Sequence, residues 1–496
     1  MDPRTPVIVG VAQLNRRPTE AELPDATEPV AMMAEVVRAA AADAGSGDAL
    51  LARVTGLRVM RVTEWHYADA AEMLAATLGF GPPDRAVSGL GGNSVQRLLT
   101  ESAAAIQRGE HAAVVLCGAE AAHTFALARK VGFALPWTPD TPTADDAPPS
   151  PRHPAEDAIG LRSVREFFPL LDNAIRRRTG ATIAEHTARI GRMWSNYSLV
   201  AAANPYAWSP RVRTPDEITT VTADNRMICF PYTKVMNAYA RVDQAAALIV
   251  CSVEIARSLG ISEDRWVFPL AGATCHEHWF VSERDDLGVS VGMGANADAV
   301  LGAAGVTVDD VRHLDLYACF PAPPQLAADA LGVAVDDPER PLTCTGGLAF
   351  AGGPGNSYMT HAIANVVGRL REDPGSLGFA SGVGWYATTH SAGLYGTRPP
   401  ESGFRRLDPQ TAVDAGPRRA VATAYDGRGE LETYTVSHDR DGAPERAFLA
   451  VRTPDDARAW ATSTDPDLLL ALEAEELLGS PVEIRVGRAR VRPWRR

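Results

Sequence analysis

The chain has 496 residues, of which 46% are hydrophobic and 22% are charged, close to the averages of soluble globular proteins. This composition excludes extended disorder and fibrous repeats. The 61 acidic residues outnumber the 48 lysines and arginines, and the net charge of −13 argues against a protein that binds long nucleic acids.

The first residues, MDPRTPVIVGVAQLNRRP, lack the apolar run of a signal peptide. No stretch approaches the ~20 apolar residues of a membrane span. We therefore expect a cytoplasmic protein with neither nucleic-acid nor membrane partners.

The six cysteines are too few and too scattered for a disulfide framework, and no CxxC pair is present. The segment Cys275-His276-Glu277-His278 contains metal-ligand residue types. Adjacent strand residues point to opposite faces, however, so these four cannot all reach one ion. We predict no metal site.

The N-terminal part alternates strands with helices. Residues 7–12 form a short β-branched run, and an alanine-rich helical stretch follows at 27–44. Residues 84–92 lead into a second helix, and the run AVVLC at 113–117 is typical of a strand buried on both faces. The second helix has an apolar face made of Val95, Leu98, Leu99, Ser102 and Ile106. This alternation predicts a largely parallel sheet.

Two segments of unusual composition follow. The proline-rich stretch at 136–154 cannot form a ladder or a helix interior, so we expect an exposed excursion. The stretch at 173–206 has a helical pattern and is basic within an acidic protein. Its arginines fit either a solvated helix face or a phosphate-binding surface.

A second series of strands and helices begins after the buried run at 244–251 and extends through 314–320 to 377–396. Two α/β halves of similar size are therefore predicted. After Arg398 the sequence alternates polar and apolar residues between Gly and Asp turns, which indicates short antiparallel strands. A small β domain is expected at the end of the chain.

Four segments carry a resemblance to a known family: AAIQRGEHAAVVLCGAE at 104–120, the helix and strand at 292–320, GGLAFAGGPGNS at 346–357, and the stretch at 230–250. They resemble the thiolase superfamily, and the fourth is most similar to its sterol-carrier-protein-X branch. The resemblance runs from the N-terminus to about residue 398. It implies a thiolase fold, in which two βαβαβαββ halves build five αβαβα layers.

The resemblance also implies a domain organisation. The N-terminal half is expected at 1–265 with an inserted loop region at 121–240, and the C-terminal half at 266–400. Residues 408–496 resemble the OB-like β-barrel domains that accompany thiolase-fold proteins. The arginines near its end, with Trp494, fit one basic face of a final strand. A homodimer is usual in this family, but the extra domain could prevent dimerisation, so a monomer is the alternative.

The catalytic residues of the family are missing at the positions that align. The nucleophilic cysteine position falls on Gly92, and the position of the activating histidine falls on Gly353. Tyr317 takes the place of an Asn or His, and no cysteine lies near 382–384, where Val383 or His390 is opposite the site. The resemblance therefore implies a pocket without the thiolate on which thiolase chemistry depends.

Coenzyme A or a CoA ester is the implied ligand, and no other cofactor is expected. Its thioester end would lie among Gly92, Tyr317 and Gly353, with further pocket residues Asn93, Phe320, Gly352 and Pro354. One hypothesis is a CoA-ester-binding protein without ordinary thiolase turnover. The other is an acyl-CoA enzyme without a covalent cysteine, either an acyltransferase or a retro-aldolase that uses Tyr317 and Tyr358 as acid and base.

Two histidines, His390 and His361, have the side chain that most often serves as a general acid or base. His390 lies near the last catalytic loop of the family and is a candidate catalytic residue. His361 has apolar neighbours along its helix, and a polar contact near the helix start is the expected role.

Overall fold

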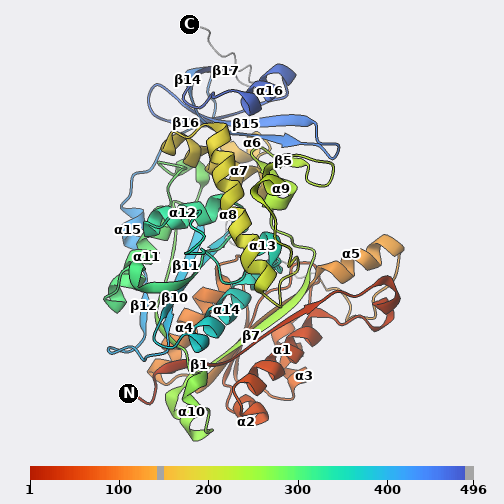
Figure 1. Ribbon diagram of the computed structural model, residues 1–496, viewed down its shortest axis with the longest axis vertical. Coiled ribbons are helices and arrows are strands. Elements are labelled where there is room, and N and C mark those ends of the chain that lie inside the picture. Colours follow the sequence, from red (N-terminus) through yellow and green to blue (C-terminus); the bar gives the residue numbers. More distant parts are fainter. Residues whose placement is uncertain (142–149, 486–496) are drawn as a thin grey trace.

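The computed structural model describes residues 1–141 and 150–485. The first half of the chain builds a sheet with the strand order β1-β7-β4-β2-β3 (Figure 1). Its strands are β1 (Pro6–Arg16), β7 (Asp243–Ser252), β4 (Ala113–Ala121), β2 (Gly56–Val59) and β3 (Asp84–Val87). The central strands β4 and β7 are buried along their whole length, as the apolar runs predicted.

The second half repeats this arrangement. Its sheet has the order β12-β8-β11-β10-β9, formed by β12 (Arg405–Leu407), β8 (Phe268–His276), β11 (Thr389–Gly396), β10 (Leu377–Gly384) and β9 (Val311–Asp315). β7 runs antiparallel to β1 and β4, and β11 runs antiparallel to β8 and β10 in the same way. The prediction of two similar α/β halves is therefore confirmed.

The prediction of a largely parallel sheet is confirmed for four of the five strands of the first sheet. β4, β2 and β3 are parallel neighbours and β1 has the same direction, whereas β7 runs antiparallel between β1 and β4. The reason is that β7 enters the sheet after the long excursion of the loop region, not through the helical crossover that joins parallel strands.

Helices form layers around and between the two sheets. α4 (Ser94–Arg108) and α14 (Tyr358–Glu372) contact strands of both sheets and so lie between them. α1 (Pro29–Asp43), α2 (Gly47–Leu51) and α3 (Ala70–Leu78) cover the outer side of the first sheet, and α10 (Val253–Ser258) lies beside them. α11 (Val291–Ala304) covers the second sheet, with α12 (Ala322–Leu331) beside it. This is the αβαβα layering of the thiolase fold.

The predicted apolar face of α4 is confirmed in the core. Val95, Leu99 and Ile106 are buried there, and so are Leu98 and Ser102. Because the helix lies between two sheets, further residues outside that face are buried as well. Its N-terminal end is thereby fixed at the centre of the molecule.

The loop region connects β4 to β7. It contains α5 (Ala122–Val131), α6 (Pro154–Ala158), α7 (Val164–Thr179), α8 (Ile183–Ala203), α9 (Pro215–Thr219), β5 (Met227–Cys229) and β6 (Tyr232–Thr233). The helical stretch predicted at 173–206 is interrupted, because Gly180 has a left-handed φ of 67° and Thr182 starts a new helix with a capping box to Glu185. α13 (Gly347–Phe350) comes later in the chain, before α14.

The arginines of α7 and α8 bind acidic residues of the protein itself. Arg176 and Arg177 pair with Glu476 and Glu430 of the C-terminal region. Arg178 and Arg192 pair with Asp329 and Asp336 of the second half, each at 2.8 Å. Arg176 and Arg177 therefore join parts of the fold, whereas Arg178 and Arg192 are about half exposed and fit the solvated-face interpretation.

The C-terminal region contains α15 (Gln410–Asp414), β13 (Val421–Ala422), β14 (Gly427–His438), β15 (Pro444–Arg452), β16 (Arg458–Ser463), α16 (Pro466–Ala474) and β17 (Pro481–Ile484). The strands β14 to β17 and α16 lie at the top of Figure 1, at the opposite end from α1, α2 and α3, whereas α15 lies lower and contacts α11 and β8. β14, β15 and β16 are antiparallel neighbours, as the alternating sequence predicted.

This sheet also takes in strands from the loop region. Its order is β13-β16-β15-β14-β5-β6, and β17 pairs with β14. The strand pairs among the described residues leave its two ends unjoined. The OB-like barrel therefore stays a prediction. In the part of the chain that the structure describes, no helix is long and apolar enough to cross a membrane.

Candidate functional site

The candidate site lies at the N-terminal end of α4. The loop Gly91-Gly92 precedes the helix, and Asn93 is its N-cap residue. Thr389 donates a hydrogen bond from Oγ1 to the Asn93 side chain (2.9 Å), and Ser391 donates from Oγ to the Asn93 carbonyl oxygen (3.0 Å). Both partners belong to β11, so the end of α4 is fixed against the second sheet.

Tyr317 fills the space above Gly92. A methyl group added to Gly92 would overlap the Tyr317 hydroxyl and lie 2.5 Å from the carbonyl oxygen of Val383. No side chain can therefore stand at position 92 unless its surroundings move. The phenol occupies the volume that the nucleophile of the resembling family would require.

The position of Tyr317 is fixed by a backbone hydrogen bond and by the packing of its buried side chain. It follows β9, its amide donates to Ser381 Oγ (3.3 Å), and its exposed fraction is 6%. Burial raises the pKa of its phenol well above the ordinary value. Tyr317 is therefore neutral across the physiological pH range.

Tyr358, the first residue of α14, lies next to Tyr317. The two ring centroids are 5.3 Å apart and the rings are nearly perpendicular. The Tyr358 hydroxyl is 2.6 Å from Thr345 Oγ1 and donates to Asp315 Oδ1 at 3.4 Å. The Tyr358 hydroxyl thus belongs to a buried hydrogen-bond network.

Asp315 is the centre of that network. Its carboxyl accepts hydrogen bonds from Thr343 and from the amides of Cys344 and Thr345. Burial raises the pKa of Asp315 to about 6, although the hydrogen bonds oppose the increase. The sequence analysis missed this group. The available signal was an acidic residue within the apolar run LDLYACF.

The residues that directly follow the Gly352–Pro354 segment contact the same end of α4. Asn356 accepts a hydrogen bond from the Gly91 amide at Oδ1 (2.9 Å), which joins the two glycine-containing loops. Gly352 has a φ of 110°, and an added methyl group would overlap Gln244 Oε1. At Gly353 an added methyl group would meet only ordinary contacts, so the backbone there has room for a Cβ.

A buried carboxyl group lies behind this loop and was also missed. Glu120, at the end of β4, accepts hydrogen bonds from the amide and the hydroxyl of Thr63, each at 2.9 Å. Burial and the neighbouring Glu64 raise the pKa of Glu120 well above its usual range. Gly355 packs so closely against Glu120 that a side chain there would overlap the carboxyl.

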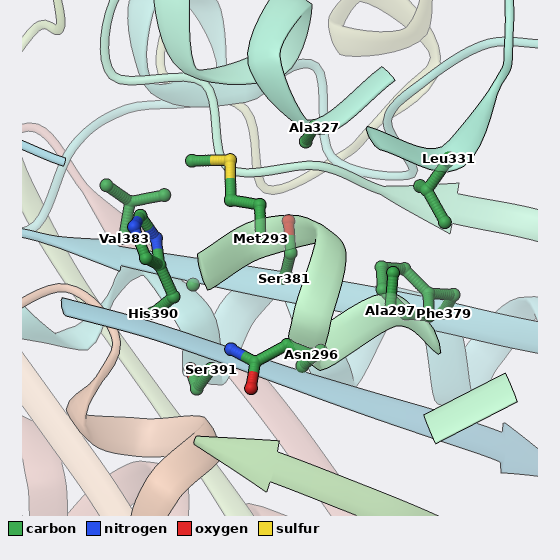
Figure 2. Close-up of a pocket in the computed structure, with 12 residues that line it drawn as sticks. Met293, Asn296, Ala297, Ala327, Leu331, Phe379, Ser381, Val383, His390 and Ser391 are labelled. Carbon is green, nitrogen blue, oxygen red and sulfur yellow. The ribbon is translucent and has the colours of Figure 1, made fainter. Parts of the chain in front are cut away.

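His390 lies on the other face of the second sheet. Its neighbours Thr389 and Ser391 point to Asn93, so strand alternation turns His390 toward α11. Figure 2 shows it beside Val383 and Met293, at a cavity of about 10 Å³ that Asn296 also lines.

A carboxylate accompanies His390 on that face. Its Nε2 is 3.3 Å from Glu277 Oε1. Burial disfavours ionisation of Glu277, yet His390, Arg284 and Ser290 hold its pKa down at about 2. His390 is therefore not brought together with Gly92, because a strand presents adjacent residues to opposite faces.

Phe320 is also placed away from Gly92. Its ring stacks on Phe168 at 4.7 Å and on Tyr232 at 6.1 Å, among residues of the loop region. The predicted residues that the structure brings together are Gly92 with Tyr317 and Tyr317 with Tyr358. Gly352 lines a cavity together with Tyr358. Among the described residues, no group of three or more His, Cys, Asp or Glu side chains is arranged to hold a metal ion.

Comparisons with known proteins agree with this fold. Residues 408–488 match a family model described as the additional C-terminal domain of thiolase-like protein type 1. A crystal structure of a monomeric SCP2-thiolase-like protein type 1 from Mycobacterium smegmatis is 32% identical. The alignment covers 99% of this chain and 100% of that one, with a TM-score of 0.84.

More distant structures share the fold. The Ltp2-ChsH2(DUF35) aldolase is 19% identical with a TM-score of 0.60, over 79% of this chain and 98% of that one. Acat5 thiolase from Ascaris suum, solved with coenzyme A, is 13% identical with a TM-score of 0.57, over 79% and 99%. The search of curated proteins gives no match.

Proposed function

The chain belongs to the SCP2-thiolase-like proteins of type 1, and from this premise we propose that it binds coenzyme A or a CoA ester without carrying out the thiolase reaction. The observation that carries the proposal is the overlap of Tyr317 with the side-chain space of Gly92. Thiolase chemistry begins when a thiolate at that position attacks a thioester carbonyl carbon. Gly92 has no nucleophilic side chain, and the neutral Tyr317 phenol occupies the space that such a side chain would need.

Other cysteines do not replace the missing thiolate. Burial raises the pKa of the thiol in every one of the six. Cys319, the cysteine nearest to Tyr317 in sequence, is among them. Each thiol is therefore protonated at neutral pH and is a poor nucleophile.

CoA binding is supported by what remains of the site. The Acat5 thiolase, which shares the fold, was solved with coenzyme A. The N-terminal end of α4 lies between the sheets, and the Gly91 amide before it donates a hydrogen bond to Asn356, which follows the Gly352–Pro354 segment. A helix N-terminus with free amides favours an anion or a carbonyl oxygen, which suits a thioester.

The experiment is a pair of measurements on the full chain. Mass spectrometry after incubation with acetoacetyl-CoA and CoA should detect no acetyl-CoA. Calorimetry or thermal melting should show binding, because a ligand at 100 times its Kd stabilises the folded state by about 2.7 kcal/mol. Formation of acetyl-CoA, or failure to bind any CoA species, would contradict the proposal.

A retro-aldol reaction is the second candidate, and the contact between the rings of Tyr317 and Tyr358 favours it. Two phenols could serve as acid and base for carbon–carbon bond cleavage. Replacing Tyr317 and Tyr358 by Phe separates the candidates. An aldolase would lose orders of magnitude in the formation of a ketone or aldehyde from a hydroxyacyl-CoA, whereas a binding protein would form neither before or after substitution.

We also propose that the protein is a monomer. The relative from Mycobacterium smegmatis is described as monomeric. Light scattering at micromolar concentration should give about 53 kDa, the mass of one chain being 52.8 kDa, and a mass near twice that would overturn this part of the proposal.

A further inference from the structure

A second feature lies behind the Gly352–Pro354 segment. A cavity of about 10 Å³ is enclosed between β1, β7 and α14, and Gln13, Gln244, Tyr358 and His361 contribute to its lining. A space of this size accommodates the centre of one water molecule. A buried water also needs two to four polar partners.

Two buried polar atoms in this lining lack a partner among the described residues. They are Gln244 Oε1 and His361 Nε2. Gln244 is 2% exposed and His361 is 5% exposed. Leaving a buried polar atom without a hydrogen bond costs about 1–3 kcal/mol, so both atoms require an explanation.

The orientation of the Gln244 amide is fixed by the backbone. Its Nε2 donates to the carbonyl oxygens of Tyr206 (3.1 Å) and Ala351 (2.8 Å). Both hydrogens of the amide are thereby used, and a carbonyl oxygen cannot donate. The remaining atom must be the amide oxygen, which can only accept a hydrogen bond.

The protonation of His361 follows from a similar chain of contacts. Asn365 donates from Nδ2 to the His361 carbonyl oxygen (2.9 Å) and to Gln13 Oε1 (3.2 Å). The atom of Gln13 at this position is therefore an acceptor. His361 Nδ1 is 3.0 Å from the same atom, so Nδ1 carries the hydrogen.

The other ring nitrogen is then left as an acceptor. Burial lowers the pKa of His361 to about 3, so the ring is neutral near pH 7. A neutral imidazole protonated at Nδ1 has a lone pair at Nε2. The two unpartnered atoms among the residues that line the cavity are consequently both acceptors, and a donor with two hydrogens would satisfy them.

We propose that this cavity binds a single water molecule, which donates one hydrogen bond to His361 Nε2 and one to Gln244 Oε1. The water joins β7 to α14 directly behind Gly352, the residue that packs against Gln244. It satisfies both buried acceptors with the only common neutral donor that fits the space.

Nitrogen-15 NMR of the full chain tests the hydrogen positions. Long-range proton–nitrogen correlations should show His361 protonated at Nδ1, with Nε2 shifted as a hydrogen-bonded acceptor. A high-resolution crystal structure should show one ordered water within about 3 Å of both acceptor atoms. Protonation at Nε2, or a cavity without ordered density, would overturn the proposal.

A substitution tests whether His361 holds the water. His361→Phe keeps the ring shape and removes the acceptor, so the density peak should be lost. His313→Phe is the matched control, because His313 lies elsewhere and contacts Asp373, and the peak should remain in this variant. If His361→Phe does not fold, the NMR measurement on the unaltered chain decides. Persistence of the peak in a folded His361→Phe variant would contradict the proposal.

Discussion

Gly92 shows how the absence of a single side chain fixes the chemistry of a site. The Tyr317 hydroxyl and the Val383 carbonyl oxygen close the space around its Cα. Protein interiors are packed so densely that even one methyl group is felt. The position could therefore not regain a nucleophile by one substitution.

The close packing around Gly92 predicts that Gly92→Ala destabilises the protein. The added methyl group should lower the free energy of unfolding by about 1–3 kcal/mol, the usual range for overpacking. Gly302→Ala is the matched control, because nothing lies within 4 Å of the added group there and alanine in a helix is favoured over glycine by about 1 kcal/mol. Urea unfolding measures both. Equal stability of Gly92→Ala and the parent chain would show that Tyr317 moves aside freely.

His361 gives a second prediction at this scale. Its pKa is 6.5 in the unfolded chain and about 3 in the folded one, because burial disfavours the charged ring. The unfolded state then binds more protons between these values, so this group lowers stability as the pH falls from 6.5 to 3. The maximum loss is about 5 kcal/mol at 1.36 kcal/mol per pKa unit.

The measurement is urea unfolding at several pH values. His361→Phe should show a shallower loss of stability between pH 6.5 and 4 than the parent chain. Phe133→Leu is the control, since Phe133 is exposed and carries no titratable group, so this variant should leave the slope unchanged. Identical slopes in the parent and His361→Phe would show that His361 is protonated in the folded state.

At the scale of elements, the buried cation Arg458 links β16 to the segment around Ser282 in the second half of the chain. Arg458 forms two hydrogen bonds of 2.7 Å to the carboxyl of Glu432. It also donates to the carbonyl oxygens of Ser282 (2.8 Å) and Arg284 (2.6 Å). A side chain of β16 thereby satisfies the backbone of a segment that contains no long helix or strand.

Arg458→Ala should therefore be strongly destabilising. It leaves Glu432 buried without its main partner, and removing one member of a buried pair typically costs 3–5 kcal/mol. Arg485→Ala is the matched control, because its pair with Glu483 is exposed and should contribute less than about 1 kcal/mol. Thermal melting followed by circular dichroism compares them. Equal melting temperatures would mean that the Arg458 contacts add nothing to stability.

Elements also differ in how far the sequence predicts them. β4 and α4 were predicted because long apolar runs and helical spacing survive in any surroundings. β5 and β6 were missed, because strands of two or three residues have no periodic signal, and β14, which pairs with β5, is distant in sequence. The break at Gly180 could have been predicted from the sequence. A glycine is a signal for the end of a helix, and Thr182 with Glu185 three residues later is a signal for the start of the next one.

The site residues divide in a similar way. Gly92 and Tyr317 were selected from aligned positions, but only the three-dimensional packing places the phenol in the space of the missing side chain. His390 depends on strand register, and a shift of one residue reverses the face of a strand. Asp315 and Glu120 were missed because a single acidic residue in a buried strand does not indicate its partners.

At the scale of the whole molecule, the C-terminal region completes the loop region. Arg176 of α7 reaches the Tyr434 hydroxyl at 3.0 Å, and Asn173 donates to the Tyr434 carbonyl oxygen at 2.9 Å. Strands of both regions share one sheet. The two regions are therefore one structural unit, although about 200 residues separate them in sequence.

A chain that ends at residue 407 tests this conclusion. It lacks β14 and the partners of Arg176, so buried charge and unpaired strand edges would be exposed. We expect a lower melting temperature and aggregation by size-exclusion chromatography. A chain that ends at residue 485 keeps every contact described and should match the parent. A stable, monodisperse chain of 407 residues would show that the C-terminal region is dispensable for folding.

The pairing of β5 with β14 also has a consequence for protein synthesis. Phe230 and Thr435, which are joined by a hydrogen bond, lie 205 residues apart. A ribosome adds about 5–20 residues per second, so β5 waits on the order of ten seconds or more for its partner to emerge. During that interval the edge of β5 is available to other chains. We expect nascent copies of this protein to depend on chaperones until residue 438 has left the ribosome.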